Sequence, residues 1–162
     1  MRLSNRNKAG FYQFLSTLHI VLFFSGVSMF LLERYNYHKL GFHAYLLLLI
    51  PALLLIVFFW RGRQIFEYDS DGEALNFKNR NVILFLNKTL NDEFPKYKLI
   101  SYEIVNFIIL KKLYVTVSSK KSHTLILNYD ISYLTKKELN DLNQSLKKVS
   151  KLNRENKETE NT

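Results

Sequence analysis

The histidines are the side chains of this sequence best suited to bind a metal ion or a haem iron, and their spacing argues against a shared site. His19 and His43 both lie inside long apolar runs. At 1.5 Å per residue of helix, His19 would lie about 12 Å inside one end of its run, and His43 about 4–5 Å inside the opposite end of the other. These different depths do not suit two ligands of one iron atom. We therefore expect no cofactor, and we expect His19 to form a hydrogen bond to the neighbouring helix.

The composition and residue spacing of the chain also argue against other catalytic or metal-binding sites. The chain has no cysteine, which excludes disulfides, thiolate catalysis and cysteine-ligated zinc or iron–sulfur centres. Residues 69–72, Asp-Ser-Asp-Gly, resemble the start of a calcium loop, but the sixth position is Ala74 instead of glycine and the twelfth is Arg80 instead of glutamate. No phosphate-binding loop or nucleophile–base pattern is present. The sequence predicts a protein that is not an enzyme and has no catalytic, cofactor-binding or metal site.

The net charge of +9 is the next constraint on function. A basic chain can bind nucleic acid, but none of the helix or strand motifs of nucleic-acid-binding proteins occurs here. Several basic residues instead flank the two apolar runs, which is the distribution expected beside anionic lipid. We therefore expect membrane lipids as partners and no nucleic acid.

The two apolar runs, residues 11–32 and 40–60, contain no formally charged side chain. Each matches the roughly 20 residues that an α-helix needs to cross the hydrocarbon core, and a backbone in lipid satisfies its polar groups by forming a helix. The first run exceeds the ~7–15 apolar residues of a signal peptide and has no small-residue cleavage motif. The short connector, residues 33–39, makes the predicted spans an antiparallel hairpin. Small residues at 25–28 offer a close helix contact, although such composition is also ordinary in membrane helices.

Basic residues at the ends of the runs predict the orientation. Three lie within the N-terminal residues 1–10, and Arg61 and Arg63 follow the second run. Positive charge favours the cytoplasmic side, so both termini are predicted to be cytoplasmic in a multi-pass integral membrane protein. The predicted membrane-interface residues combine two arginines with aromatic side chains at the span ends: Arg61, Arg63, Trp60, Tyr35 and Tyr37.

Residues 64–150 are predicted to form a cytoplasmic domain of six or seven antiparallel strands. Alternating apolar and polar residues indicate the strands, and Asp71-Gly72 between two of them indicates a hairpin turn. Lys111 and Lys112 are predicted to interrupt the pattern, and residues 91–94 to form a polar loop. The predicted strands are residues 64–68, 74–78, 82–86, 98–102, 104–110, 113–118 and 123–129.

An amphipathic helix is predicted to close the domain. Thr135 and Glu138 form the Thr-x-x-Glu pattern of a capping box, and four apolar residues between 139 and 149 follow at helical spacing. Such a stripe can lie on a membrane surface, but directly after a sheet we expect it to pack on that sheet. Residues 151–162 are polar and are predicted to be a disordered tail.

Two phrases of the domain resemble the bacterial pleckstrin-homology-like (PH-like) domains of small membrane proteins: EFPKYKLISYEI and KLYVTVSSKKSHTLILNYDISYLTKKELNDLNQSL. In that family a proline leads into a strand, matched here by Pro95 and residues 98–104, and the domain often adjoins two membrane helices. The resemblance covers residues 64–150. It implies a mostly-β barrel with a C-terminal helix, located at the bacterial inner membrane, with no catalytic residues. Inositide-binding relatives have a basic first loop, whereas residues 69–73 are acidic, so inositide recognition there is not expected.

The sequence as a whole predicts a non-enzymatic interaction module, held at the membrane by a helical hairpin, that binds a protein partner or assembles as a homo-oligomer. Residues 102–110 and the acidic first loop are its candidate contacts. The alternative is a sensor of the membrane surface or of anionic lipid, at about 1 kcal/mol per basic residue. The candidate lipid-facing residues are two pairs at opposite ends of one short predicted strand: Lys111, Lys112, Lys120 and Lys121.

Overall fold

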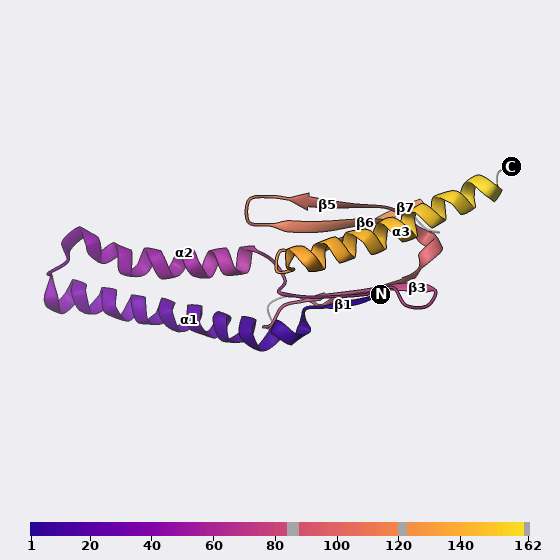
Figure 1. Ribbon diagram of the computed structural model, residues 1–162. Coiled ribbons are helices and arrows are strands. Elements are labelled where there is room, and N and C mark those ends of the chain that lie inside the picture. Colours follow the sequence, from indigo (N-terminus) through magenta and orange to yellow (C-terminus); the bar gives the residue numbers. More distant parts are fainter. Residues whose placement is uncertain (84–87, 120–122, 161–162) are drawn as a thin grey trace. The chain divides into compact units, whose positions relative to one another are not determined.

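The computed structural model of the chain describes residues 1–83, 88–119 and 123–160 (Figure 1). The chain forms two compact units. The first, Gly10–Trp60, is here called the helical unit. The second combines Met1–Ala9 with the chain from Arg61 onward and is called the sheet unit. Because the sheet unit takes chain from both sides of the helical unit, the two helices are an insertion in its sequence.

The helical unit is a pair of antiparallel apolar helices, α1 (Ala9–Leu32) and α2 (Leu46–Trp60). A π-helical turn, Glu33–Tyr37, and a 3-10 turn, Gly41–Tyr45, lie between them. With the adjoining turns, the two helical stretches reach 32 and 20 residues and are long and apolar enough to cross a membrane. Only 11% of the most apolar window of each is buried, whereas the core helix of a soluble domain is mostly buried.

The two helices approach closely at Gly26. A Cβ atom added there would lie 2.3 Å from the carbonyl oxygen of Leu47 and 3.1 Å from the ring of Pro51. Glycine is therefore required at this point, in the way that small residues let membrane helices pack closely. Of the residues 25–28, Gly26 thus supplies the helix contact.

His19 differs from its prediction. Its Nδ1 lies 2.6 Å from the carbonyl oxygen of Leu15, which belongs to the same helix. The contact to α2 is instead aromatic, since the His19 ring stacks on Phe58 at 5.2 Å between ring centroids. A polar side chain in a helix can form a hydrogen bond to the carbonyl oxygen four positions earlier in the same helix. His19 therefore needs no hydrogen-bond partner on α2.

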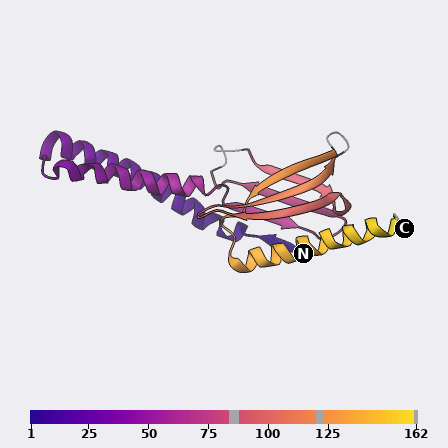
Figure 2. The same cartoon turned by 90° about the horizontal axis from the view of Figure 1, so that it is seen from above.

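The sheet unit contains two antiparallel sheets and a long helix (Figure 2). Sheet A has the strand order β1-β2-β3-β4, and sheet B has the order β5-β6-β7. The bounds are β1 (Arg2–Ser4), β2 (Ile65–Asp69), β3 (Ala74–Arg80), β4 (Leu90–Pro95), β5 (Leu99–Asn106), β6 (Lys111–Ser119), β7 (His123–Asp130) and α3 (Lys136–Glu160), with a 3-10 turn, Lys96–Lys98, between the sheets.

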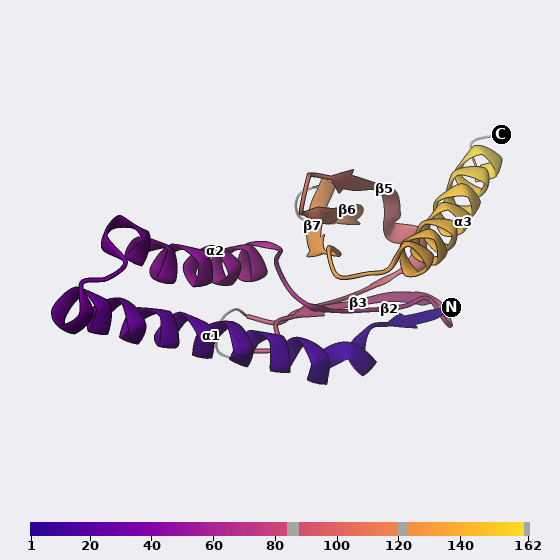
Figure 3. The same cartoon turned by 60° about the vertical axis from the view of Figure 1, so that its left-hand side comes forward.

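The core of the sheet unit lies between the two sheets and α3 (Figure 3). The ring of Phe77 on β3 stacks on Phe94 of β4 at 5.7 Å and on Tyr129 of β7 at 4.9 Å, so it joins the two sheets. Leu142 and Leu146 of α3 are fully buried. Each contributes about 1.5–3 kcal/mol by leaving water. The prediction that the amphipathic helix packs on the sheets is confirmed.

The layout confirms two N-terminal helices, a small antiparallel sheet domain and a C-terminal helix, but β4 corrects one part of the prediction. Residues 91–94, predicted as a polar loop, belong to β4, which pairs with β3 along its whole length. β4 ends sheet A, so its polar side chains can face solvent while Phe94 is buried. Pairing with β3 therefore outweighs the weak strand propensity of Asn, Asp and Glu.

The turn between β5 and β6 is a second correction. The sequence predicts a strand over residues 104–110 and a break at Lys111 and Lys112. In the structure the turn is residues 107–110, and the two lysines begin β6. All four residues of the turn are apolar, and an apolar run of this kind predicts a strand instead of a turn.

The domain boundaries also differ from the prediction. Residues 1–10, expected only as a cytoplasmic N-terminus, provide β1, so the sheet unit is not confined to residues 64–150. Residues 151–160 are helical, although residues 151–162 were predicted to be disordered. Asn153 holds this part of α3 by donating to the carbonyl oxygens of residues 96 and 99, at 2.6 and 2.9 Å.

The structure describes only part of the predicted strand over residues 82–86. Val82 and Ile83 are not in a strand. Residues 84–86 lie outside the described residues, so this part of the prediction stays open.

Candidate functional site

Two segments, residues 5–8 and 61–64, connect the sheet unit to the helices and are together called the junction. They lie side by side, because the side chain of Asn5 donates to the carbonyl oxygen of Gln64 at 2.8 Å and accepts the N–H of Phe66 at 2.8 Å. Asn5 is fully buried, so these bonds form where water does not compete with them. Asparagine suits the position because its amide both donates and accepts. Both chain passages therefore leave the sheet unit at one end.

Asp130, the last residue of β7, fixes the second segment of the junction. Its Oδ2 accepts hydrogen bonds from the backbone N–H and from Nη1 of Arg63, both at 3.1 Å. Gly62 passes the same carboxylate with a φ of +83°, and an added Cβ would lie 2.5 Å from Asp130 Cγ. The left-handed backbone and the lack of room for a Cβ atom both require glycine at this position. Asn79 holds Asp130 in turn, accepting its N–H at 2.8 Å and donating to its carbonyl oxygen at 3.0 Å.

Arg61, the first residue after α2, is also held by the sheet unit. Its Nη2 donates to the carbonyl oxygen of Ser132 at 3.2 Å, and its guanidinium lies 4.6 Å from the ring centroid of Tyr133, a cation–π distance. The structure thus brings Arg61 and Arg63 together at the junction, and their contact with a membrane stays a prediction. The other predicted interface residues are exposed side chains of the helical unit: Trp60, Tyr35 and Tyr37.

The first segment of the junction is tied to the start of α3. Lys8 Nζ lies 2.9 Å from Oε1 of Glu138. The capping box is confirmed: Thr135 Oγ1 accepts the N–H of Glu138 at 3.2 Å, and the Glu138 carboxylate accepts the N–H of Thr135 at 2.6 Å. Burial alone would raise the pKa of Glu138, but the hydrogen bonds from Thr135 and Lys8 lower this pKa below its usual value.

Of the four lysines that were predicted to face lipid, the structure describes Lys111 and Lys112. The N–H of Lys111 donates to Oγ of Ser132 at 2.9 Å, so Lys111 and the next residue, Lys112, begin β6 beside the junction. Lys120 and Lys121 lie outside the described residues, beyond the other end of β6 in the sequence. The nine residues of this strand separate its ends by about 27 Å. Lipid contact by either pair stays a prediction.

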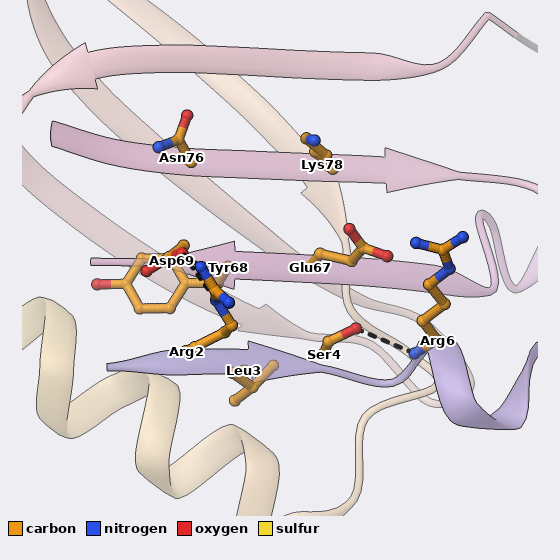
Figure 4. A pocket seen from close by; sticks show the side chains of 9 residues that line it. All are labelled: Arg2, Leu3, Ser4, Arg6, Glu67, Tyr68, Asp69, Asn76 and Lys78. Atoms are coloured by element: carbon orange, nitrogen blue, oxygen red, sulfur yellow. Dashed lines mark hydrogen bonds and ion pairs between the residues drawn. The ribbon is translucent and has the colours of Figure 1, made fainter. Parts of the chain in front are cut away.

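A polar concavity of about 390 Å³ lies across β1, β2 and β3 on sheet A (Figure 4). Arg2 Nη2 lies 2.8 Å from Oδ2 of Asp69, and Glu67 stands opposite Lys78 in the register of β2 and β3. The backbone N–H of Asp71 and then the Arg2 side chain hold the pKa of Asp69 below its usual value. Opposite charges already face one another here, which leaves little uncompensated charge for a ligand.

A groove of about 490 Å³ lies between β4 and β7 and is called the β4–β7 groove. Its lining is apolar at Phe94 of β4, Val117 of β6, and Leu125 and Leu127 of β7. Leu125 is about half exposed. The lining also includes charged residues: Asp92, Glu93 and Lys98.

The edges of the two sheets differ in how far other parts of the chain cover them. α3 runs beside β5, where Tyr102 OH donates to Oδ1 of Asn143 at 2.8 Å, and β1 is only three residues long. β7 pairs with β6 on one side, and within the described ranges no strand pairs with its other side. Ile126 of β7 is 64% exposed. The outer edge of β7, with the β4–β7 groove beside it, is the candidate functional site.

Comparison with known proteins gives no relative, because the chain has no significant match to a family model, a curated protein or a solved structure. Within residues 1–83, 88–119 and 123–160, no group of three or more His, Asp or Glu side chains is placed to hold a metal ion. The function is therefore inferred from the chain's own geometry.

Sequence reasoning missed the polar residues that organise the junction: Asn5, Asn79 and Asp130. Each is a single polar residue at or near a strand end, where such residues are common in ordinary turns. Within the junction, Gly62 is the one glycine, and it was the signal there of a special backbone conformation.

Proposed function

We propose that this protein is a non-enzymatic, membrane-anchored interaction module whose sheet unit binds an extended segment of a partner protein at the outer edge of β7. The observation that carries the proposal is an eight-residue edge strand with exposed apolar side chains beside a groove that is lined in part by apolar side chains. Extended peptides bind such edges by adding a strand. Main-chain hydrogen bonds then supply affinity, and pockets for alternate side chains supply specificity.

The hydrogen-bond register identifies the backbone groups that β7 would offer. The N–H of Ile131 donates to the carbonyl oxygen of Lys111 at 2.9 Å, which continues the ladder between β6 and β7. In an antiparallel ladder, alternate residues turn their N–H and C=O away from the partner strand. Asp130 follows this rule, because its N–H does not bond to β6. The same alternation turns the backbone groups of Ile126 and Asn128 outward, where an added strand would pair.

β7 lacks the features that usually protect an exposed strand edge. Its sequence has no proline, lysine or arginine, and its register with β6 is continuous. Leu125 lines the β4–β7 groove, while Ile126 lies on the opposite face of the strand. An edge with exposed apolar side chains favours aggregation unless a partner covers it.

We further propose that the helical unit anchors the sheet unit in the bacterial inner membrane, with both termini in the cytoplasm. The length and low burial of the two helices support a pair of spans, and the basic residues of the junction support the orientation. A four-stranded and a three-stranded antiparallel sheet followed by a long helix are the layout expected of a PH-like domain. That layout supports a PH-like sheet unit whose first connection, between β1 and β2, contains the spans.

The test is co-purification of the full chain, tagged at its C-terminus, from its own host in a mild detergent. Ile126→Lys places a charge on the outer edge of β7. Ile100→Lys is the matched control, because Ile100 is an exposed isoleucine on the edge strand that α3 accompanies. We expect a stoichiometric partner that is retained by Ile100→Lys and lost from Ile126→Lys.

The other outcomes of this experiment are distinct. A homo-oligomer lost only from Ile126→Lys would identify the occupant of the edge as a second copy of the chain. A partner retained by both variants would place the contact away from β7. Absence of any partner or oligomer would contradict the proposal.

Anionic-lipid sensing is the second candidate function, favoured by the basic residues that meet at the junction. Arg61 and Lys111 both bind Ser132, so they lie at the end of the sheet unit that contains the junction. A lipid sensor should show slower hydrogen exchange at this end in anionic than in neutral vesicles. Lys111→Gln with Lys112→Gln should remove that difference.

A further inference from the structure

The turn between β5 and β6 consists of residues 107–110, here called the apolar tip. The N–H of Phe107 donates to the carbonyl oxygen of Leu110 at 2.7 Å, which leaves Ile108 and Ile109 as the two central residues of the turn. The exposed fractions are 56% for Phe107, 103% for Ile108 and 37% for Ile109. Single exposed apolar residues are common on proteins, whereas a contiguous exposed run indicates a contact.

The composition of the apolar tip opposes the usual chemistry of a tight turn. Two-residue hairpin turns favour Asn, Asp and Gly, which adopt turn conformations at low cost. The longer connection between β2 and β3, residues 70–73, has the usual turn composition, with Asp71 and Gly72. Isoleucine is β-branched and favours strands, so Ile108 and Ile109 are locally unfavourable where they stand. Such a conflict marks a position where another requirement, often functional, decides the residue.

The apolar tip projects from the junction end of the sheet unit. β7 ends at Asp130, opposite Lys112, whereas β5 and β6 continue to pair as far as Asn106 and Lys111. The hairpin therefore extends past the end of β7. Ile108 lies two residues beyond Asn106, the partner of Lys111, and so about 7 Å further along the hairpin.

The same end of the sheet unit carries the connection to α2. Ser132 binds both Lys111 at the base of the tip and Arg61 in the junction. Arg61 directly follows Trp60, the last residue of α2. If α2 crosses a membrane, this end of the sheet unit is held at the membrane surface by the chain itself. The start of α3 lies at this end too (Figures 1 and 2), tied to the junction by Lys8.

We propose that the apolar tip inserts into the interface of the bilayer as a third membrane contact beside the two helices. Phe107, Ile108 and Ile109 enter the boundary between headgroups and acyl chains, and Lys111 and Lys112 face the anionic phosphate layer. Apolar residues followed at once by basic ones match a lipid surface in both polarity and charge. The contact fixes the tilt of the sheet unit and so presents the β7 edge in one orientation. This inference rests on the anchoring part of the proposed function and is independent of the partner at β7.

A single fluorescent label tests the insertion, because the chain has no native cysteine. Ile108→Cys carries an NBD fluorophore in the full chain, reconstituted in vesicles of phosphatidylethanolamine and phosphatidylglycerol. Glu73→Cys is the matched control, in an exposed hairpin turn at the end of β2 away from the junction. Lipids with a nitroxide in the upper acyl chain quench a fluorophore at that depth. We expect blue-shifted, quenched emission at position 108 and water-like, unquenched emission at position 73.

Each other outcome overturns part of the account. Unquenched emission at both positions, with the chain floating with the vesicles, would overturn the insertion and leave the anchoring intact. Blue-shifted but unquenched emission at position 108 would assign the tip to a protein contact instead. Failure of the chain to float with vesicles would overturn the anchoring and the insertion together. Ile109→Asp, added to the labelled chain, should return position 108 to water-like emission, and unchanged quenching would contradict insertion of the tip.

Discussion

Replacing Gly62 by alanine tests how tightly the junction is packed. Gly72 is the matched control, because its backbone is also left-handed but its surroundings leave room for a Cβ atom. Gly62 and Gly72 both have left-handed backbones, with φ of +83° and +69°. A Cβ at Gly72 would meet nothing within 4 Å, whereas a Cβ at Gly62 would lie 2.5 Å from Asp130 Cγ. Comparing the two alanine variants separates backbone strain from displacement of the carboxylate.

The expected losses follow from these two contributions. A left-handed alanine costs about 1–2 kcal/mol relative to glycine, and the loss of unfolded-chain entropy offsets about 0.4–1 kcal/mol. Gly72→Ala should therefore lower the free energy of unfolding by about 1 kcal/mol. Gly62→Ala also displaces the acceptor of two Arg63 hydrogen bonds, and hydrogen bonds to charged groups contribute about 1.5–3 kcal/mol. Its total loss should be about 3 kcal/mol.

Pulse proteolysis of the full chain in detergent, across a urea series, measures these losses for the sheet unit. In an Asp130→Ala background the obstructing carboxylate is gone, so Gly62→Ala should then cost only about 1 kcal/mol. Equal losses for Gly62→Ala and Gly72→Ala in the native background would refute the packing described at the junction.

Three further predictions concern other contacts. Asn5→Leu leaves two buried backbone groups without their partner and should lower the free energy of unfolding by about 3 kcal/mol in the same assay; a loss below about 1 kcal/mol would contradict the buried bonds. The lowered pKa of Glu138 means that its stabilisation is present above the ordinary pKa of about 4.3 and is lost as pH falls through the lower folded value. Glu138→Gln should therefore lower the urea midpoint at pH 7, and this difference should shrink below about pH 4; a pH-independent difference would contradict the assignment. Gly26→Val should lower the thermal midpoint of the full chain in detergent, since its Cβ meets Leu47, while Gly10→Val, with nothing within 4 Å, should not; equal midpoints would contradict the helix contact.

The elements that depend on local sequence were predictable. The two apolar helices follow from uncharged runs of sufficient length, and α3 follows from its capping box at Thr135 and Glu138 and its apolar stripe. The turn at Asp71 and Gly72 follows from the preference of these residues for turn conformations. In each case the determining interaction lies within a few residues in the sequence.

The elements that depend on distant partners were not predictable. β1 exists because Arg2 pairs opposite Asp69, across the whole helical insertion. β4 exists because β3 accepts it as a neighbour, although its own residues favour a loop. The apolar tip was predicted as strand, since the composition of residues 107–110 does not reveal exposure.

The candidate site was predictable only in part. The alternation over residues 123–129 predicted a strand, and β7 is that strand. Its position at the end of sheet B follows from the order β5-β6-β7, which no local pattern in the sequence encodes. The groove beside it also requires β4, which was predicted as a loop.

We propose that the outer edge of β7 is occupied by another protein segment in the cell. Site-specific photo-crosslinking tests it most directly: benzoylphenylalanine replaces Ile126 in the full chain, expressed in its own host, with Ile100 as the control position. We expect one discrete adduct from position 126 that is absent from position 100. Its mass would distinguish a partner protein from a second copy of the chain. No adduct from position 126, or the same adducts from both positions, would show that no protein segment binds specifically at the outer edge of β7.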